Sequence, residues 1–390
     1  MADDRIPVAR PWLGEEEAEA ARRVILSGWV TQGPEVAAFE REFAAYTGAP
    51  HACAVSNCTA GLQLALRAAG VGQGDEVVTV SHSFIATAAV VRHAGATPVF
   101  VDVQPGTCNL DPALLEASLS ARTRAVLCVH QMGMPCDLRA ILAVARRHGL
   151  PVVEDAACAA GSEILRDGAW ERVGKPHGDV ACFSFHPRKV ITAGEGGLLT
   201  TSNAEWDRRF RLWRQHGMTV ADTARHEAGS VIFESYAELG YNCKMTDIQA
   251  AVARAQLRRL PEMVRRRREQ AERYRELLAE CPDISLPEEP EWARSNWQSF
   301  CVRLPAGVSQ RRVMERMLAL GVATRRGVMC SHLEPAFDGE PWTAAGGSLA
   351  HSEAARDRGL VLPLFHAMTN EQQARVARAL KQALEEEHAG

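Results

Sequence analysis

The chain has 390 residues, of which 46% are apolar and 24% are charged, and its formal net charge is −4 at pH 7. A length of this order suits two domains with separate cores. The slightly acidic balance gives no reason to expect a nucleic-acid or an anionic membrane partner.

Targeting and metal-binding patterns are missing from the sequence. No apolar run approaches the length of a membrane span, and the acidic start MADDRIPVARPW has no apolar core of a secretory signal. The eleven cysteines form no C-x-x-C pair, and many lie inside apolar runs, as Cys53, Cys128 and Cys182 do. We expect reduced, mostly buried thiols in a cytoplasmic protein. The thirteen histidines show no H-x-x-x-H spacing, so no metal site is predicted.

Short apolar runs alternate with helical patterns through the first two thirds of the chain. The stretch PEVAAFEREFAAYTG predicts a helix with Pro34 in its first turn and Gly48 just after its end, and TAGLQLALRAAG predicts the next. Several strand candidates are apolar throughout, as expected when both faces of a sheet are covered. The alternation predicts an α/β domain with a mainly parallel sheet. The strand candidates are 51–56, 76–82, 97–103, 125–130, 151–156, 180–185 and 197–202.

The pattern changes near residue 260. A long, highly charged helix is predicted over 261–280, followed by a strand over 299–304 and a helix over 309–321. A last helix is predicted to begin at Asn370, with Gln373 completing a capping box. We therefore expect a large domain over residues 1–260, including an N-terminal arm, and a small domain over 261–390.

Lys189 lies in CFSFHPRKVITAGEGG, four residues after an apolar strand that ends at Phe185. The carboxyl ends of strands are where α/β sheets place their chemistry. A lysine attacks a carbonyl only when unprotonated, and burial would help by disfavouring the charged form. The glycines that follow would let the backbone pass close to a ligand. From spacing alone, a solvated turn lysine explains the pattern equally well.

Three further stretches bear on the choice. Asp155 ends the apolar run VVED and is either a helix cap or the partner of a protonated pyridine nitrogen, as pyridoxal 5'-phosphate (PLP) requires. In SNCTAG, the start of a helix and the Thr59 hydroxyl form either an ordinary cap or a phosphate cradle. Phe84 follows another strand and belongs either to the core or against a planar cofactor.

Along nearly its whole length, the chain resembles the DegT/DnrJ/EryC1/StrS family of PLP-dependent sugar aminotransferases. The resemblance is carried by SGWVTQGPEVAAFEREFAAYTG, SNCTAGLQLAL, SFIATA, VDV, GMPCDL, VVEDAACAAGS, FSFHPRKVITAGEGG and GYNCKMTDIQAA, in that order. It implies the α/β fold of the PLP-dependent transferases of type I (aspartate aminotransferase-like), with a mixed, mainly parallel sheet and a smaller α+β C-terminal domain. It also implies a homodimer whose active sites are shared between the subunits.

The resemblance assigns roles by motif position. Lys189 would form the internal aldimine and then act as the general base, and Asp155 would pair with the pyridine nitrogen. The other implied roles are phosphate binding by Cys58, Thr59 and Ser184, ring stacking by Phe84, a contact to the neighbouring subunit's cofactor phosphate by Asn242, and substrate contacts by His186, Trp29 and Arg325.

The sequence departs from the family pattern at three places. Cys58 stands where the family often has glycine, and Cys158 stands where many members have a glutamine that binds the ring hydroxyl, so a weaker donor is expected beside the cofactor. The stretch TRRGVMCSHLEPAF replaces a tyrosine- and proline-rich segment near the nucleotide-sugar site. Its Arg325, Arg326 and His332 either meet an anionic substrate or form an ordinary surface patch.

The family implies transfer of an amino group from L-glutamate (or L-glutamine) to a keto-sugar, with ping-pong kinetics. A nucleotide-linked keto-6-deoxyhexose, in polysaccharide or antibiotic biosynthesis, is the favoured acceptor. A keto-cyclitol of aminoglycoside biosynthesis is the alternative within the class. A non-catalytic PLP-binding regulator is the alternative outside it. Sugar dehydration at C3 is disfavoured, because members with that activity carry histidine where this chain has Lys189.

Overall fold

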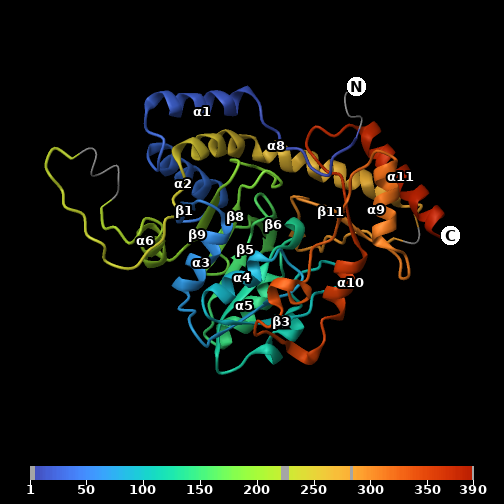
Figure 1. Ribbon diagram of the computed structural model, residues 1–390, viewed down its shortest axis with the longest axis horizontal. Helices are drawn as coiled ribbons and strands as arrows, with labels where there is room; N and C mark the ends of the chain where they lie inside the picture. The colour runs from blue at the N-terminus through green and yellow to red at the C-terminus, as the bar shows by residue number, and fades with distance from the viewer. Residues whose placement is uncertain (1–4, 221–227, 282–283, 389–390) are drawn as a thin grey trace.

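The computed structural model describes residues 5–220, 228–281 and 284–388. Its centre is an eight-stranded sheet in the order β1-β9-β8-β5-β4-β2-β3-β13 (Figure 1). Strand β9 runs antiparallel to both of its neighbours and all other neighbours are parallel, so the predicted mixed, mainly parallel sheet is confirmed. All seven predicted strands are present. The strands are β1 (His51–Val55), β2 (Glu76–Val80), β3 (Thr97–Val101), β4 (Thr123–Val129), β5 (Val152–Asp155), β8 (Val180–Ser184), β9 (Gly197–Thr201) and β13 (Thr343–Ala344).

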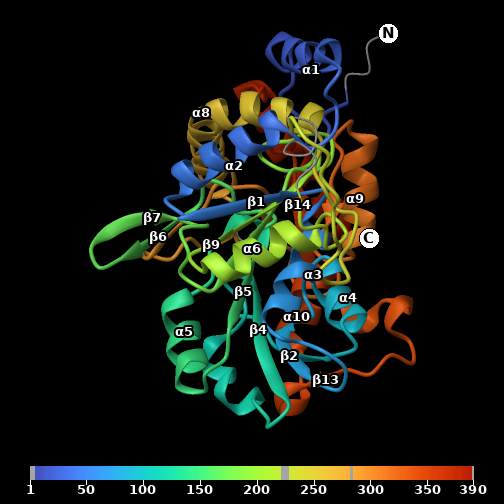
Figure 2. The same cartoon turned by 90° about the vertical axis from the view of Figure 1, so that its left-hand side faces the viewer.

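Helices cover both faces of this sheet (Figure 2). One core contains α2, α5 and α8, and a second core on the other face contains α3, α4 and α6. This explains why the strand sequences are apolar throughout rather than alternating. The predicted helix from Pro34 is α2, and Gly48 ends it with φ 81°. The helices are α2 (Pro34–Thr47), α3 (Cys58–Ala68), α4 (Ala86–His93), α5 (Leu138–Arg147), α6 (Ala204–Trp213) and α8 (Asp247–Leu278).

Helix α8 is longer than the sequence predicted. It runs unbroken for 32 residues from Asp247, so the expectation of a separate helix beginning at 261 is wrong. Pro261 lies inside it, where it removes one backbone hydrogen bond. Extensive packing of the helix on the core outweighs that loss, since Leu260 and Met263 on either side are fully buried. The domain boundary predicted at residue 260 would fall inside this helix and stays a prediction.

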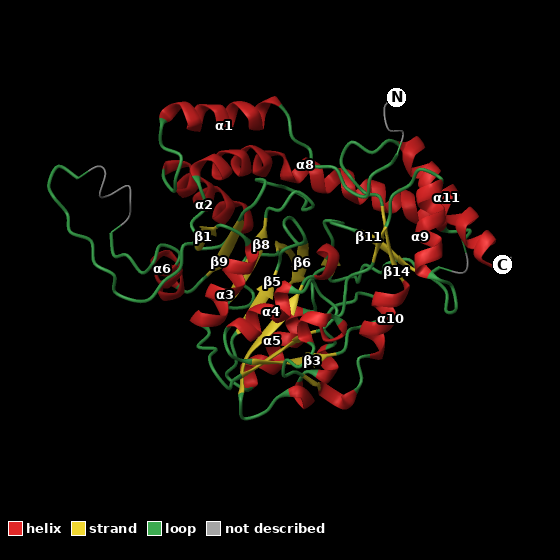
Figure 3. Ribbon diagram, in the orientation of Figure 1, coloured by secondary structure: helices red, strands yellow, loops and turns green. Residues whose placement is uncertain are grey.

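A smaller lobe surrounds the far end of α8 (Figure 3). Its antiparallel sheet has the order β11-β14-β12. The last helix begins at Asn370 as predicted, but the capping box is formed by Thr369 and Gln372. Gln373 instead donates to the Gln270 carbonyl of α8, so its position reflects packing between helices. The lobe contains β11 (Phe300–Arg303), β12 (Arg325–Arg326), β14 (Gly359–Leu362), α9 (Gln310–Ala319), α10 (Ala350–Arg358) and α11 (Asn370–His388).

A third small sheet was not predicted. It has the order β10-β6-β7 and is formed by β6 (Glu163–Arg166), β7 (Ala169–Arg172) and β10 (Ala293–Arg294). Its strands have two to four residues, and β7 has no fully buried position, so no apolar period marks them. No helix in the described part of the chain is long and apolar enough to cross a membrane.

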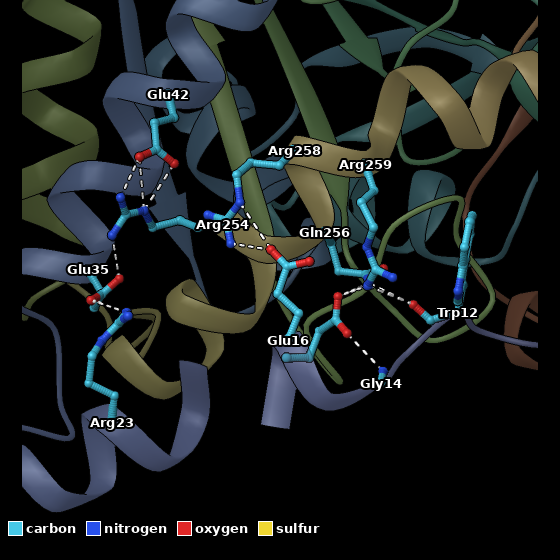
Figure 4. Close-up of polar contacts among 11 residues, drawn as sticks. Trp12, Gly14, Glu16, Arg23, Glu35, Glu42, Arg254, Gln256, Arg258 and Arg259 are labelled. Carbon is cyan, nitrogen blue, oxygen red and sulfur yellow. Dashed lines mark hydrogen bonds and ion pairs between the residues drawn. The ribbon is translucent and has the colours of Figure 1, made fainter. Parts of the chain in front are cut away.

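The N-terminal helix α1 (Glu15–Ser27) lies along α8 (Figure 1). Figure 4 shows the ion pair between Arg258 and Glu16, which are 2.6 Å apart. Arg259, the next residue of α8, pairs with Glu17. Gln256 also donates to the buried Glu17 carboxylate at 2.7 Å. Because Glu17 has both partners and is only 3% exposed, it is the main polar anchor of α1.

Helix α2 is tied to α8 in the same way. The Asp247 carboxylate at the start of α8 accepts hydrogen bonds from the backbone amides of Gly33, Glu35 and Val36 at 2.8, 3.1 and 3.0 Å. These are the amides that a helix start leaves unpaired. Arg254, about two turns further along, bonds to Glu35 at 2.6 Å (Figure 4). Helix α8 therefore supports both N-terminal helices.

Candidate active site

Four of the predicted cofactor-binding segments meet at one edge of the large sheet. Asp155 ends β5 and Ser184 ends β8, while Phe84 follows β2 and Cys58 follows β1. Strand β1 is antiparallel to β9, which is antiparallel to β8, so β1 runs parallel to the others and its carboxyl end lies at the same edge. This is the edge where α/β sheets bind ligands.

The carboxylate of Asp155 is fixed by two hydrogen bonds. Oδ2 accepts from the Thr87 hydroxyl at 2.8 Å, and Oδ1 accepts from the Ala157 amide at 3.1 Å. The Thr87 hydroxyl is itself 2.7 Å from that of Ser83. Thr87 was not predicted, although it lies in the SFIATA motif three residues after Phe84. Among the described residues, no lysine, arginine or histidine lies within ion-pair distance of this buried carboxylate.

Lys189 lies close to two acids and is half-buried. Its Nζ donates to Cys158 Sγ at 3.1 Å. Burial opposes the positive charge, but the Cys158 thiol and the Asp155 carboxylate outweigh it and raise the pKa of Lys189 above its ordinary value. Burial favours the neutral amine as the sequence predicted, but the net shift of the pKa is upward, because the sequence did not show which acids would face the amine.

The start of α3 lies beside the same edge. Asn57 is its N-cap, and its Oδ1 accepts from the Ala60 amide at 2.8 Å, so the capping residue is Asn57 rather than Thr59. Cys58 is the first helical residue, so a side chain at this position causes no backbone strain. A Cβ on Gly197 would lie 2.4 Å from the Asn57 carbonyl carbon, so this glycine lets β9 pass the helix start. Helix starts of this kind bind phosphate.

The other residues near the edge differ in exposure. The side chain of Phe84 is 56% exposed, so it does not belong to the core and is free to stack on a planar group. Ser184 is half-buried, and its Oγ accepts from the His186 amide at 3.4 Å. Burial lowers the pKa of His186 below its ordinary value. Thr59 is exposed beside the start of α3.

Three further predicted contacts are Trp29, Arg325 and Asn242. Trp29, between α1 and α2, donates from Nε1 to the Gln32 carbonyl at 3.1 Å. Arg325 is exposed on β12 in the smaller lobe, and Asn242 is exposed just before α8. No contact between them and Lys189 is described, so their roles stay predictions.

The basic residues next to Arg325 are engaged within the chain. Arg326 pairs with Glu334 at 3.0 Å. His332 Nδ1 is 2.6 Å from the Ser81 hydroxyl, and its Nε2 is 3.4 Å from Glu353. These contacts favour a structural role for both side chains over direct contact with an anionic substrate.

The donor set fits PLP. The buried Asp155 carboxylate lacks a cation, which a protonated pyridine nitrogen would supply. Lys189 offers a primary amine to an aldehyde, Phe84 offers an aromatic face, and the start of α3 offers amides to a phosphate. Among the residues the structure describes, no cluster of three or more histidine, cysteine or acidic side chains is placed to bind a metal ion.

Comparison with known proteins gives likenesses over the full length. The DegT/DnrJ/EryC1/StrS aminotransferase family matches residues 11–381. The spore coat polysaccharide biosynthesis protein SpsC of Bacillus subtilis is 36% identical over 370 residues, 94% of each chain. The PLP form of the putative sugar aminotransferase Spr1654 from Streptococcus pneumoniae is 26% identical with a TM-score of 0.89, covering 98% of this chain and 99% of that one. DesI, solved in the presence of its TDP-sugar product, is 34% identical with a TM-score of 0.86, covering 99% and 95%.

Proposed function

Because the chain belongs to the DegT/DnrJ/EryC1/StrS aminotransferase family, we propose that it transfers an amino group from L-glutamate (or L-glutamine) to a keto-sugar. Membership of this family, the type I aminotransferase fold, the aminotransferase class and the PLP cofactor are confirmed. The donor and the acceptor are the parts we propose.

The observation that carries the proposal is that Asp155, whose carboxylate has no ion-pair partner among the described residues, lies at the same sheet edge as Lys189 and acts on its charge. When bound, PLP withdraws electrons from the carbon that carries the amino group, provided its ring nitrogen stays protonated. Asp155 would hold that proton, and Thr87 would hold Asp155 in place. Lys189 Nζ would move the proton between the reacting carbons, which requires the amine to be unprotonated at that step.

We propose the start of α3 as the phosphate site, with Cys58, Thr59 and Ser184 as the contacts. The helix dipole and the first amides favour an anion there. Phe84 would cover one face of the ring. Cys158 would contribute a weak donor where a glutamine would contribute a strong one, so less support for the ring hydroxyl is expected.

For the acceptor we propose a nucleotide-linked keto-6-deoxyhexose. The support is the likeness to DesI, solved with a TDP-sugar product, and to SpsC, named for polysaccharide biosynthesis. His186, Trp29 and Arg325 are the proposed substrate contacts. A keto-cyclitol remains the alternative within the class, because the segment around Arg325 departs from the family pattern.

We also propose a cytoplasmic homodimer with shared active sites. Helix α6 is followed by a segment that extends away from the body of the protein (Figure 1). Its side chains Val231, Phe233 and Leu239 are 84%, 91% and 89% exposed. Apolar side chains gathered in this way mark interaction surfaces. Asn242 follows the same segment and would reach the cofactor phosphate of the neighbouring subunit.

The test starts from the pyridoxamine form of the purified protein. This form is offered a panel of nucleotide-linked 4-keto- and 3-keto-6-deoxyhexoses and of keto-cyclitols, and the return of the PLP absorbance is followed. We expect return with at least one nucleotide-linked sugar and none with Lys189→Ala. If the PLP absorbance returned only with a keto-cyclitol, the alternative acceptor would be supported. Failure of L-glutamate and L-glutamine to form the pyridoxamine state would support a non-catalytic regulator.

A further inference from the structure

A cavity of about 70 Å³ lies between the large sheet and the smaller lobe. Its large-domain wall comes from the segments that follow β2, β3 and β4, including His82, Cys108 and Met132. Its other wall includes Cys301 and Arg303 of β11. The cavity therefore lies at the carboxyl ends of parallel strands, where α/β sheets bind ligands. None of its lining residues is among the proposed cofactor contacts.

A fully buried histidine of the cavity wall has an unpartnered nitrogen. His82 Nδ1 is 3.4 Å from the amide nitrogen of Gln131, which donates. The proton of the neutral ring is then on Nε2, and Nε2 has no hydrogen-bond partner. Burial lowers the pKa of His82 to about 4, so the ring is neutral at physiological pH. His82, a residue of the cavity wall, thus has a buried N–H donor that lacks an acceptor.

Arg303 supplies a second unsatisfied donor on the opposite wall. Its Nε has no hydrogen-bond partner. Nη1 and Nη2 make only long contacts, to the Pro105 carbonyl at 3.3 Å and the Ser285 hydroxyl at 3.4 Å. Among the described residues, no carboxylate lies within ion-pair distance of this guanidinium. Glu288 also lines the cavity but forms no ion pair with Arg303, so the guanidinium charge on one wall and the buried donor on the other favour an anionic ligand.

The cavity wall also has an unusual backbone. In the described residues, five side-chain-bearing positions have positive φ, and three of them line this cavity. They are Cys108, Met132 and Trp297, with φ of 58°, 57° and 49°. Backbone in this region is unfavourable for residues with a Cβ, and such residues cluster at binding and catalytic sites.

We propose that this cavity binds a small carboxylate, whose oxygens accept hydrogen bonds from His82 Nε2 and from the Arg303 guanidinium. The volume has room for roughly five water molecules, which limits the ligand to a few heavy atoms. Such a ligand bridges the large domain and the smaller lobe. His82 is followed by Ser83, whose hydroxyl contacts Thr87, the residue that holds Asp155. A carboxylate bound in this cavity can therefore influence the position of Asp155 through these residues without entering the cofactor site.

Binding can be localised by NMR of the PLP-loaded protein with 13C-labelled methionine methyl groups. Met132 and Met134 line the cavity, and Met132→Leu and Met134→Leu assign their signals. We expect the chemical shifts of these two methyl groups to change on titration with acetate, pyruvate or succinate and to reach a plateau. The neutral acetamide should leave them unchanged. A carboxylate that instead moves the signal of Met245, which packs near Gly196, would bind at the Lys189 edge and would overturn the proposal.

The charge requirement is tested with a matched pair of variants. Arg303→Met should weaken carboxylate binding at least tenfold, because it removes the only cation facing the ligand in the described wall. Arg311→Met removes an equal charge from the exposed surface of α9 and should leave binding unchanged. Cys301→Met keeps the charge but fills the cavity and should also prevent binding. Equal affinity of Arg303→Met and the parent, or no saturable shift with any of the three carboxylates, would overturn the proposal. The readout is binding, so its failure says nothing about transamination.

Discussion

Asp155 is held by one side chain, Thr87, and by one backbone amide, that of Ala157. Asp155→Ala should lower kcat by several orders of magnitude, because a bound pyridine nitrogen would lose the group that keeps it protonated. Thr87→Val leaves the Asp155 carboxylate in place but removes the hydroxyl that donates to it. A smaller decrease in kcat, of about tenfold to a hundredfold, is therefore expected. The measurement is kcat at saturating PLP. Asp155→Ala with the parent's kcat would show that another group holds the ring proton.

Cys158 sets the protonation of Lys189 before the cofactor arrives. Its thiol lies 3.1 Å from Nζ and contributes to the raised pKa of the lysine. Cys158→Ser should lower that pKa, so a larger fraction of the amine is neutral at a given pH and PLP becomes attached faster. The rate is measured across pH by borohydride trapping and mass spectrometry. Cys301→Ser, remote from the lysine, is the control. An unchanged pH profile for Cys158→Ser would mean that Asp155 alone raises the pKa.

The positions of Asp155 and Lys189 could be read from the sequence because apolar runs mark the ends of strands. Thr87 and the Cys158 contact could not, since they depend on which side chains from separate segments face one another. For the same reason the net direction of the Lys189 pKa shift could not be predicted. Burial was visible in the sequence, but the neighbouring acids were not.

At the scale of elements, one carboxylate joins β3 to α10. Asp102 accepts hydrogen bonds from the amides of His351 and Ser352 and from the Ser352 hydroxyl, at 2.9, 2.7 and 2.7 Å. Its burial opposes ionisation, but these donors outweigh it and lower the pKa of Asp102. The charged carboxylate therefore stabilises the contact above its unfolded pKa of about 3.9, and this contribution is lost as the pH falls through the lower, folded pKa.

Asp102→Asn tests that contact. At pH 7 the variant should be less stable by about 1–3 kcal/mol, because an amide oxygen replaces a charged acceptor and an NH₂ group faces donors. The difference in free energy of unfolding from the parent should shrink below about pH 3.9. Urea titrations at several pH values measure it. Asp338→Asn, at an exposed position, is the control. If the difference in free energy of unfolding did not change with pH, the charge of Asp102 would not be its cause.

Helix α1 depends on a buried anchor rather than on its exposed pairs. Glu17→Ala removes the partner of Arg259 and Gln256 and should lower the free energy of unfolding by about 2–4 kcal/mol. Glu19→Ala removes an exposed pair with Arg22 and should change it by less than about 1 kcal/mol. Limited proteolysis between α1 and α2 should accelerate only in Glu17→Ala. Equal effects of the two variants would show that α1 is held by its apolar contacts.

Element prediction succeeded where burial imposes a pattern and failed where it does not. The strands of the large sheet are covered on both faces, and their apolar runs gave bounds close to those observed. Strands β6, β7 and β10 are short and mostly exposed or half-buried, so the sequence carries no period there. Pro261 was interpreted as a helix start, whereas the packing of α8 on two lobes carries the helix through it.

At the scale of the whole molecule, the segment after α6 presents large apolar side chains that the described part of the chain does not cover. Phe233 is 91% exposed and Leu239 is 89% exposed, which is unusual for large apolar side chains unless a partner covers them. Their proximity in sequence to Asn242 connects the proposed dimer contact with the proposed shared active site. A dimer of this kind makes each cofactor site depend on residues from two chains.

Complementation between two inactive variants tests that dependence. Lys189→Ala lacks the amine proposed to transfer the proton, and Asn242→Asp replaces the amide proposed to bind phosphate with a repelling charge, so each homodimer should be inactive or nearly so. In a heterodimer with shared sites, one site collects both lesions, and the other takes its lysine and its asparagine from unmutated copies. Mixing by an unfold–refold cycle should then restore about a quarter of the parent's activity, since half of the dimers are mixed and each has one intact site. Native mass spectrometry confirms the heterodimers and their PLP content. Background activity in a sample where both are present would mean that Asn242 serves the site of its own chain, or no site at all.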